Sequence, residues 1–159
     1  MILAFFLCND IGDNSSSKFH AHFKPVFLNT DLNLANVPVP LPSSFEPKIT
    51  TRAEPLDLTM AIIAKMDEEC SQRDCRLIVM KFGRFLTTDY PQLNNLSDRV
   101  DTRFAMELHA GYLDLDAQFD SRAVTCHQLL VGNDDGHWNA FGHKLTADIL
   151  HGFLTGIGE

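Results

Sequence analysis

Continuous apolar runs alternate along the chain with segments of helical periodicity. The first run, Ile2–Leu7, holds no polar residue, as expected for a strand that is covered on both faces of a parallel sheet. In Pro55–Arg73 the apolar residues return every three or four positions, which predicts a helix, and a second apolar run follows at Arg76–Phe82. A strand, a helix and a strand in this order predict a β-α-β unit.

The second half of the chain repeats this alternation. Leu93–His109 predicts a weaker helix, and Gly111–Phe119 a short third strand that runs into a loop. A last helix is expected to begin near Asn139, a good N-cap residue, with an apolar stripe formed by Phe141, Leu145, Ile149 and Phe153. The whole pattern predicts one α/β domain over residues 1–159, built on a parallel sheet.

Residues 18–52 interrupt this pattern as an irregular insertion. Two short strands are expected there, Val26–Leu28 and Leu32–Ala35, around an Asn-Thr-Asp turn and before a proline-rich extended segment. Such an excursion either covers a site or decorates the surface, and the sequence favours neither.

Composition and charge narrow the classes of partner. The 159 residues are 45% hydrophobic and carry a net charge of -8, with lysine and arginine scattered singly, which argues against binding of nucleic acid. A small or neutral molecule is the expected partner. No apolar stretch reaches the length of a membrane-spanning helix. The opening "MILAFFLC" has neither the basic residues nor the cleavage site of a signal peptide, so a chain complete as given is expected in the cytoplasm.

The metal-ligating residue types show no pattern that predicts a metal site. The four cysteines have no CxxC spacing. Cys70 and Cys75 could form a disulfide, but reduced thiols at a helix end and a strand start are the favoured interpretation. His20 and His22 would share one face of a strand, but a metal needs a further ligand near them. The residue pattern alone therefore predicts no metal site.

The stretch "GNDDGHWNAFGHKLTADIL", Gly132–Leu150, holds the most distinctive chemistry. An aspartate three residues before a histidine can bond one ring nitrogen and so orient the ring, leaving the other nitrogen to take a proton. Asp134 and His137 have this spacing, and Gly136 would let the backbone turn between them. The same four residues "NDDG" are also typical of an ordinary turn.

Two sequence blocks together resemble a known family. "DDGHWNAFGH" before an amphipathic helix resembles the last block of the SGNH hydrolases, or GDSL esterases, and "LAFFLCNDIGDNS" resembles their Gly-x-Asn-Asp block. The resemblance implies a flavodoxin-like three-layer α/β/α sandwich and hydrolysis of O-acyl esters by a Ser-His-Asp triad. The substrate would be a small-molecule, glycan or lipid ester, and this chemistry needs neither a metal nor an organic cofactor. Asp134 and His137 would be the acid and base of this triad, and Asn9 would donate to the oxyanion hole.

The chain departs from the family pattern in two places. The glycine before Asn9 is absent, and so are the Gly-Asp-Ser block of the nucleophile and the block after it. The resemblance therefore implies a partial SGNH domain without its first strand and helix and without a nucleophile, inactive or impaired as an esterase and able to associate through an exposed sheet edge. Such a chain is either a piece of a longer hydrolase, which is the favoured explanation, or a degenerate relative that no longer catalyses. The alternatives are an SGNH-like O-acetyltransferase acting on a polysaccharide and a non-catalytic interaction module.

Several nearby residues have two interpretations. Asp114 and Asp116 could be paired carboxylates, but a solvated loop is the favoured interpretation. Trp138 could line an acyl or sugar pocket, although packing on the helix N-terminus is favoured. His143 and His151 are expected on the surface of the last helix.

Overall fold

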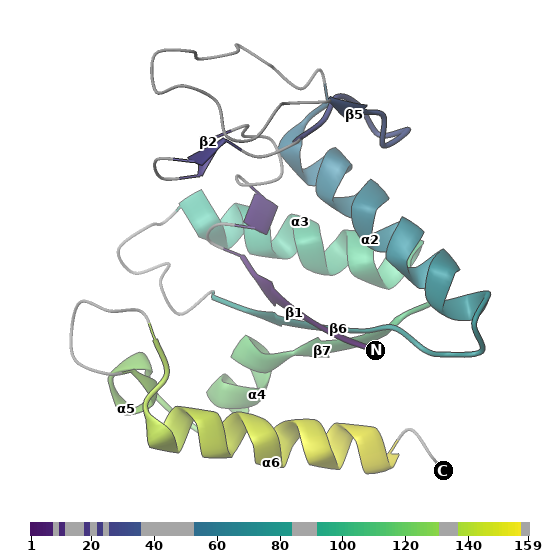
Figure 1. Cartoon of the computed structure of the whole chain (residues 1–159). Helices are drawn as coiled ribbons and strands as arrows, with labels where there is room; N and C mark the ends of the chain where they lie inside the picture. Colours follow the sequence, from purple (N-terminus) through teal and green to yellow (C-terminus); the bar gives the residue numbers. More distant parts are fainter. Residues whose placement is uncertain are drawn as a thin grey trace.

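The computed structural model describes residues 1–7, 10–11, 18–19, 22–23, 26–35, 53–83, 92–130 and 137–156. Its centre is a parallel sheet of β1 (Ile2–Phe6), β6 (Ile78–Phe82) and β7 (Gly111–Asp114), in the order β1-β6-β7 (Figure 1). The three strands end together at what we call the carboxyl edge of the sheet. The predicted parallel α/β sheet is confirmed in this part of the chain.

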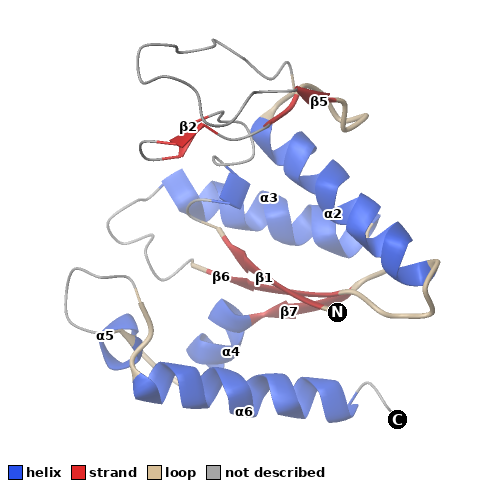
Figure 2. Ribbon diagram, in the orientation of Figure 1, coloured by secondary structure: helices blue, strands red, loops and turns tan. Residues whose placement is uncertain are grey.

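Helices cover both faces of this sheet (Figure 2). Helices α2 (Pro55–Ser71) and α3 (Gln92–Glu107) lie on one face, over a core that includes Phe5, Leu7 and Val79. The other face packs against α4 (Leu115–Ser121) and α6 (Ala140–Gly156), with α5 (Cys126–Leu129) beside the start of α6. Successive strand residues point to opposite faces, so a fully apolar strand such as Ile78–Met80 supplies both cores.

Helix α2 shows how the local sequence sets an element. The Glu54 carboxylate accepts from the backbone amides of Leu56 and Asp57, over 3.0 Å and 3.2 Å, and Pro55 stands in the first turn. Leu56, Met60 and Ile63 are buried at the predicted three- and four-residue spacing. The helix ends at Ser71, two residues before the predicted end.

The segment after β7 differs from its prediction, because it forms α4 instead of a loop. The alternation "LDLD" extends the strand pattern past its true end. The Asp114 carboxylate acts as the N-cap by accepting from the Ala117 amide over 3.2 Å, and this turns the chain into a helix.

The predicted stripe of α6 is confirmed at Leu145, Ile149 and Phe153, which pack in the core, but not at Phe141, which is 49% exposed. At the start of the helix Gly142 is buried instead. The reason lies at Gly142, because a Cβ there would stand 2.6 Å from the Leu129 carbonyl oxygen. Glycine therefore allows this face of the helix to approach α5 most closely.

Within residues 18–52, the described parts form two small antiparallel pairs separate from the main sheet. They are β2 (Lys18–Phe19) with β3 (His22–Phe23), and β4 (Val26–Phe27) with β5 (Leu34–Ala35). The second pair confirms the predicted hairpin, which the Asn29 side chain closes by accepting from the Asn33 backbone amide over 3.3 Å.

Strand β1 is an edge strand among the described residues. Ile2 is 45% exposed, whereas Ile78 to Lys81 of the central strand are buried. The Met1 carbonyl and the Leu7 amide form hydrogen bonds with β6. In a parallel pair, every second residue of a strand bonds to a given neighbour, so the backbone amides and carbonyls of Ile2 and Ala4 point away from β6. In the described part of the chain, no helix is long and apolar enough to span a bilayer.

Candidate active site

A row of aromatic rings crosses the carboxyl edge of the sheet. Phe6 at the end of β1 stacks on Phe82 at the end of β6, with ring centroids 5.0 Å apart, and Phe82 lies 4.9 Å from Trp138. Trp138 is half-buried and is bridged to Leu130. The row brings the end of the first strand and the residue after His137 to one place, although they are far apart in sequence.

His137 is the one member of the candidate triad that lies in a described segment. It is exposed and directly precedes Trp138 in the aromatic row. Asp134 and Asn9 both lie outside the described residues. Their pairing and oxyanion roles therefore stay predictions.

Asn139 anchors the chain just after His137. Its Oδ1 accepts from the Gly142 amide over 2.9 Å, which confirms the predicted N-cap. Its Nδ2 donates to the carbonyls of Gln128 and Leu130 over 2.9 Å and 3.0 Å. The start of α6 is thus tied to the end of α5, which fixes the backbone on the C-terminal side of His137.

We expect Asn139→Ala to lower the free energy of unfolding by about 2 kcal/mol, because a helix cap and two hydrogen bonds are lost together. Asn139→Ser keeps a capping oxygen and should lose about half as much. Urea unfolding followed by circular dichroism measures both. Equal losses in the two variants would contradict the capping role.

Trp138 packs on the N-terminus of α6, as favoured by the sequence. A Cβ at Gly142 would lie 3.1 Å from the Trp138 Cβ, and the Trp138 ring lies 5.8 Å from the ring of His143. His143 and His151 are exposed on α6, as predicted. His20 lies outside the described residues, and the described part of the chain holds no group of metal-ligating side chains large enough for a metal ion.

The described residues just after β1 are bonded to the ends of β1 and β6. The Leu7 amide donates to the Phe82 carbonyl over 2.9 Å, and the Asp10 carboxylate accepts from the Phe6 amide over 2.7 Å. Leu7 and Asp10 flank the segment that contains Asn9, so both sides of this segment are tied to the carboxyl edge.

Asp114 and Asp116 do not lie in a solvated loop, so the favoured interpretation of them is wrong. Asp116 is 3% exposed and accepts from the Gly83 amide over 3.2 Å. Asp114 caps α4 and forms an ion pair with Lys81. Both carboxylates stabilise the carboxyl edge, because they lie at the junction of β7 and α4 and bond to neighbouring elements there.

Lys81 is buried beneath the same edge, at 0% exposure, and the sequence interpretation missed it. Its ammonium donates to three oxygens, which are Ser97 Oγ (2.9 Å), Asp101 Oδ1 (2.6 Å) and Asp114 Oδ2 (3.2 Å). Tyr112 Oη also donates to Asp101 Oδ1. We call these five residues the Lys81 cluster. A lysine inside the apolar run "RLIVMKF" was the available signal, since a buried ammonium requires carboxylate partners.

The contact between Lys81 and Ser97 is not a nucleophile and its base. An ammonium has three donors and no acceptor, and all three donors are in use, so it cannot take the Ser97 proton. Ser97 is also fully buried. The cluster therefore has a structural role, because it holds β6, β7 and α3 together.

Burial, followed by the hydrogen bond to Asp101, raises the pKa of Tyr112 well above its usual range. The folded state therefore keeps a proton that the unfolded chain releases above about pH 10. The resulting stability is complete below about pH 10 and is lost as the pH rises further. We expect the free energy of unfolding to fall more steeply between pH 9 and 11 in the native chain than in Tyr112→Phe. Equal slopes in urea titrations would contradict this.

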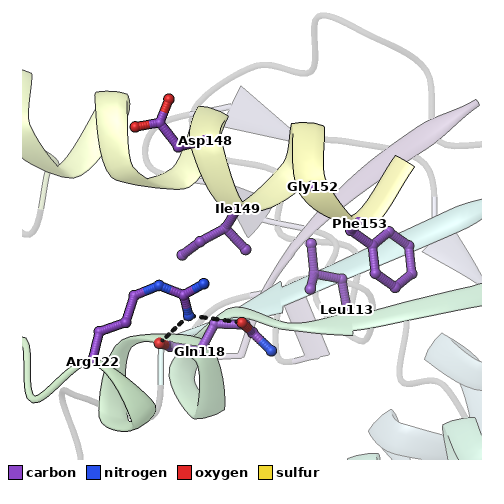
Figure 3. A pocket seen from close by; sticks show the side chains of 7 residues that line it. All are labelled: Leu113, Gln118, Arg122, Asp148, Ile149, Gly152 and Phe153. Atoms are coloured by element: carbon purple, nitrogen blue, oxygen red, sulfur yellow. Dashed lines mark hydrogen bonds between the residues drawn. The ribbon is translucent and has the colours of Figure 1, made fainter. Parts of the chain in front are cut away.

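A separate pocket of about 190 Å³ lies between β7, α4 and α6 (Figure 3). Its floor is apolar, and at its rim Arg122 Nη1 donates to the carbonyl and side-chain oxygens of Gln118, over 2.8 Å each. Its lining residues are Leu113, Gln118, Arg122, Asp148, Ile149, Gly152 and Phe153. Along the axis of α6, Asp148 lies about 12 Å from Ala140, the first residue of the helix. This pocket is therefore distinct from the part of the carboxyl edge near His137.

Comparisons with models of known protein families, with curated proteins and with solved structures found no match to this chain.

Proposed function

We propose that this chain supplies the acid–base half of an SGNH-type ester hydrolase. In the proposal, His137 is the general base and then the general acid, Asp134 orients its ring, and Asn9 donates to the oxyanion. The observation that carries the proposal is the aromatic row. At the carboxyl edge the Phe82 ring contacts both the Phe6 ring and the Trp138 ring. Phe6 lies in one of the two blocks that carry the family resemblance, and Trp138 lies in the other.

The position of the row fits this chemistry. In open α/β sheets, ligands bind beyond the carboxyl ends of the strands. The histidine is exposed to a substrate there, while Asn139 fixes the backbone after it. A rigid backbone beside an exposed base is what an acyl-transfer site needs to hold its geometry.

The proposal places the nucleophile outside these 159 residues. The described serines, Ser71, Ser97 and Ser121, do not suit the role: Ser97 is fully buried, and the other two lie at the ends of α2 and α4. The backbone groups of Ile2 and Ala4 that point away from β6 could pair with a further parallel strand. Such a strand would end at the carboxyl edge beside Phe6, which is where a serine would have to stand.

Hydrolysis of 4-nitrophenyl acetate by the purified chain tests the proposal. We expect slow hydrolysis in which His137 activates water, and His137→Ala should lower the rate at least about tenfold. His151→Ala is the matched control, because His151 is also exposed but lies near the far end of α6. Equal rates in the two variants would instead support a non-catalytic interaction module.

A fluorophosphonate probe tests the second part of the proposal, because it labels only an activated serine. We expect no labelling of this chain. Stoichiometric labelling of any serine among the 159 residues would contradict an external nucleophile while leaving the role of His137 intact.

A further inference from the structure

Two cysteines face each other across the turn that ends α2. Cys70 lies in the last turn of the helix and is 4% exposed, whereas Cys75 lies beyond the turn and is exposed. Asp74 has a φ of 53°, which reverses the chain, and the Cys75 amide donates to the Cys70 carbonyl over 2.9 Å. This hydrogen bond holds the backbones of Cys70 and Cys75 close together.

The side chains meet as well as the backbones. Burial, and then a hydrogen bond between the thiols of Cys70 and Cys75, raise the pKa of Cys70. Both cysteines are free thiols in this structure. A disulfide requires the Cα and Cβ atoms of its two cysteines to lie close together, and the 2.9 Å hydrogen bond from the Cys75 amide to the Cys70 carbonyl holds these two residues close.

We propose that Cys70 and Cys75 form a redox pair that a peroxide converts to a disulfide. The exposed Cys75 thiolate attacks the peroxide, the O–O bond breaks, and Cys75 becomes a sulfenic acid as hydroxide leaves. The Cys70 sulfur then attacks the Cys75 sulfur, the S–O bond breaks, and the Cys70 proton leaves with the oxygen as water. The two thiols lose two electrons and two protons, and hydrogen peroxide becomes two molecules of water.

The different burial of the two thiols sets this order of events. The pKa of Cys70 is raised, so Cys70 reacts slowly with a peroxide in solution, whereas Cys75 is accessible to it. Once Cys75 is oxidised, the nearest thiol is Cys70. The pair stands at the amino end of β6, opposite the carboxyl edge, so it is independent of the proposed hydrolase site.

Peptide mapping of the full chain after treatment with hydrogen peroxide tests this inference. Remaining thiols are alkylated with iodoacetamide before digestion with trypsin, which cleaves after Arg73 and so separates the two cysteines. We expect peptides 66–73 and 74–76 to be found joined, and to separate after reduction with dithiothreitol. The joined peptides should persist in a Cys8→Ala/Cys126→Ala double variant and be absent in Cys75→Ser.

The folded geometry predicts a rate as well as a product. In the folded chain, the joined peptides should form at least about tenfold faster than in urea, because the turn holds the thiols together. Equal rates in the folded and unfolded chain would overturn the inference. Accumulation of Cys75 sulfinic or sulfonic acid, or bridges to Cys8 or Cys126 in the native sequence, would overturn it too.

Discussion

Lys81→Met should lower the free energy of unfolding by about 3–5 kcal/mol, because it leaves two carboxylates without their buried cation. The Lys81 ammonium has no solvent exposure, and its bonds to Asp101 and Asp114 use carboxylates whose side chains are 30% and 19% exposed. Methionine fills much of the same volume, so the loss comes from the charge and not from a cavity. Urea unfolding monitored by circular dichroism measures the change.

Lys65→Met is the matched control. Lys65 also pairs with a carboxylate, Glu68, over 2.6 Å, but the two side chains are 49% and 55% exposed. Its loss should cost much less than the loss of Lys81, because an exposed ion pair contributes little to stability. Adding Asp101→Asn and Asp114→Asn to Lys81→Met should restore part of the stability, because the unpaired charges are then removed. If Lys81→Met lowers the free energy of unfolding by less than about 1 kcal/mol, the Lys81 cluster does not hold β6, β7 and α3 together.

Gly83→Ala should cost about 2–4 kcal/mol, from backbone strain and overpacking together. Gly83 has a φ of 121°, which side chains rarely adopt, and a Cβ there would lie 2.9 Å from the Phe6 ring. The ring cannot easily withdraw, because it stacks on Phe82. The substitution should therefore disturb the aromatic row as well as the stability.

Gly152→Ala is the matched control, and we expect it to stabilise the chain where Gly83→Ala destabilises it. Nothing lies within 4 Å of a Cβ at Gly152 in α6, so alanine should raise the free energy of unfolding by about 0.5–1 kcal/mol through helix propensity. Thermal and urea unfolding of the two variants measure the difference. A neutral Gly83→Ala would contradict the close contact between Gly83 and Phe6.

Hydrophobic patterning was sufficient to predict the main elements. The runs at Ile2–Leu7 and Arg76–Phe82 became β1 and β6, and the helical periods gave α2, α3 and α6 near their predicted positions. These elements follow from which residues can be buried together, which a sequence shows directly.

Contacts between distant segments decided what the pattern could not predict. The true end of β7 depends on Asp114 acting as a cap, and burial at the start of α6 depends on how closely α5 approaches Gly142. The Lys81 cluster joins residues of β6, α3 and β7, so no local pattern reveals it. At the candidate site, the sequence indicated His137 but not the aromatic row in which Phe82 contacts both Trp138 and Phe6.

A double-mutant cycle on ester hydrolysis tests the central claim, that Asp134 acts through His137. The rates of the native chain, Asp134→Asn, His137→Ala and the double variant are compared with 4-nitrophenyl acetate as substrate. We expect Asp134→Asn to slow hydrolysis in the native background and to change nothing once His137 is alanine. If Asp134→Asn slows both backgrounds by the same factor, the two residues do not form an acid–base pair and the proposed site is wrong.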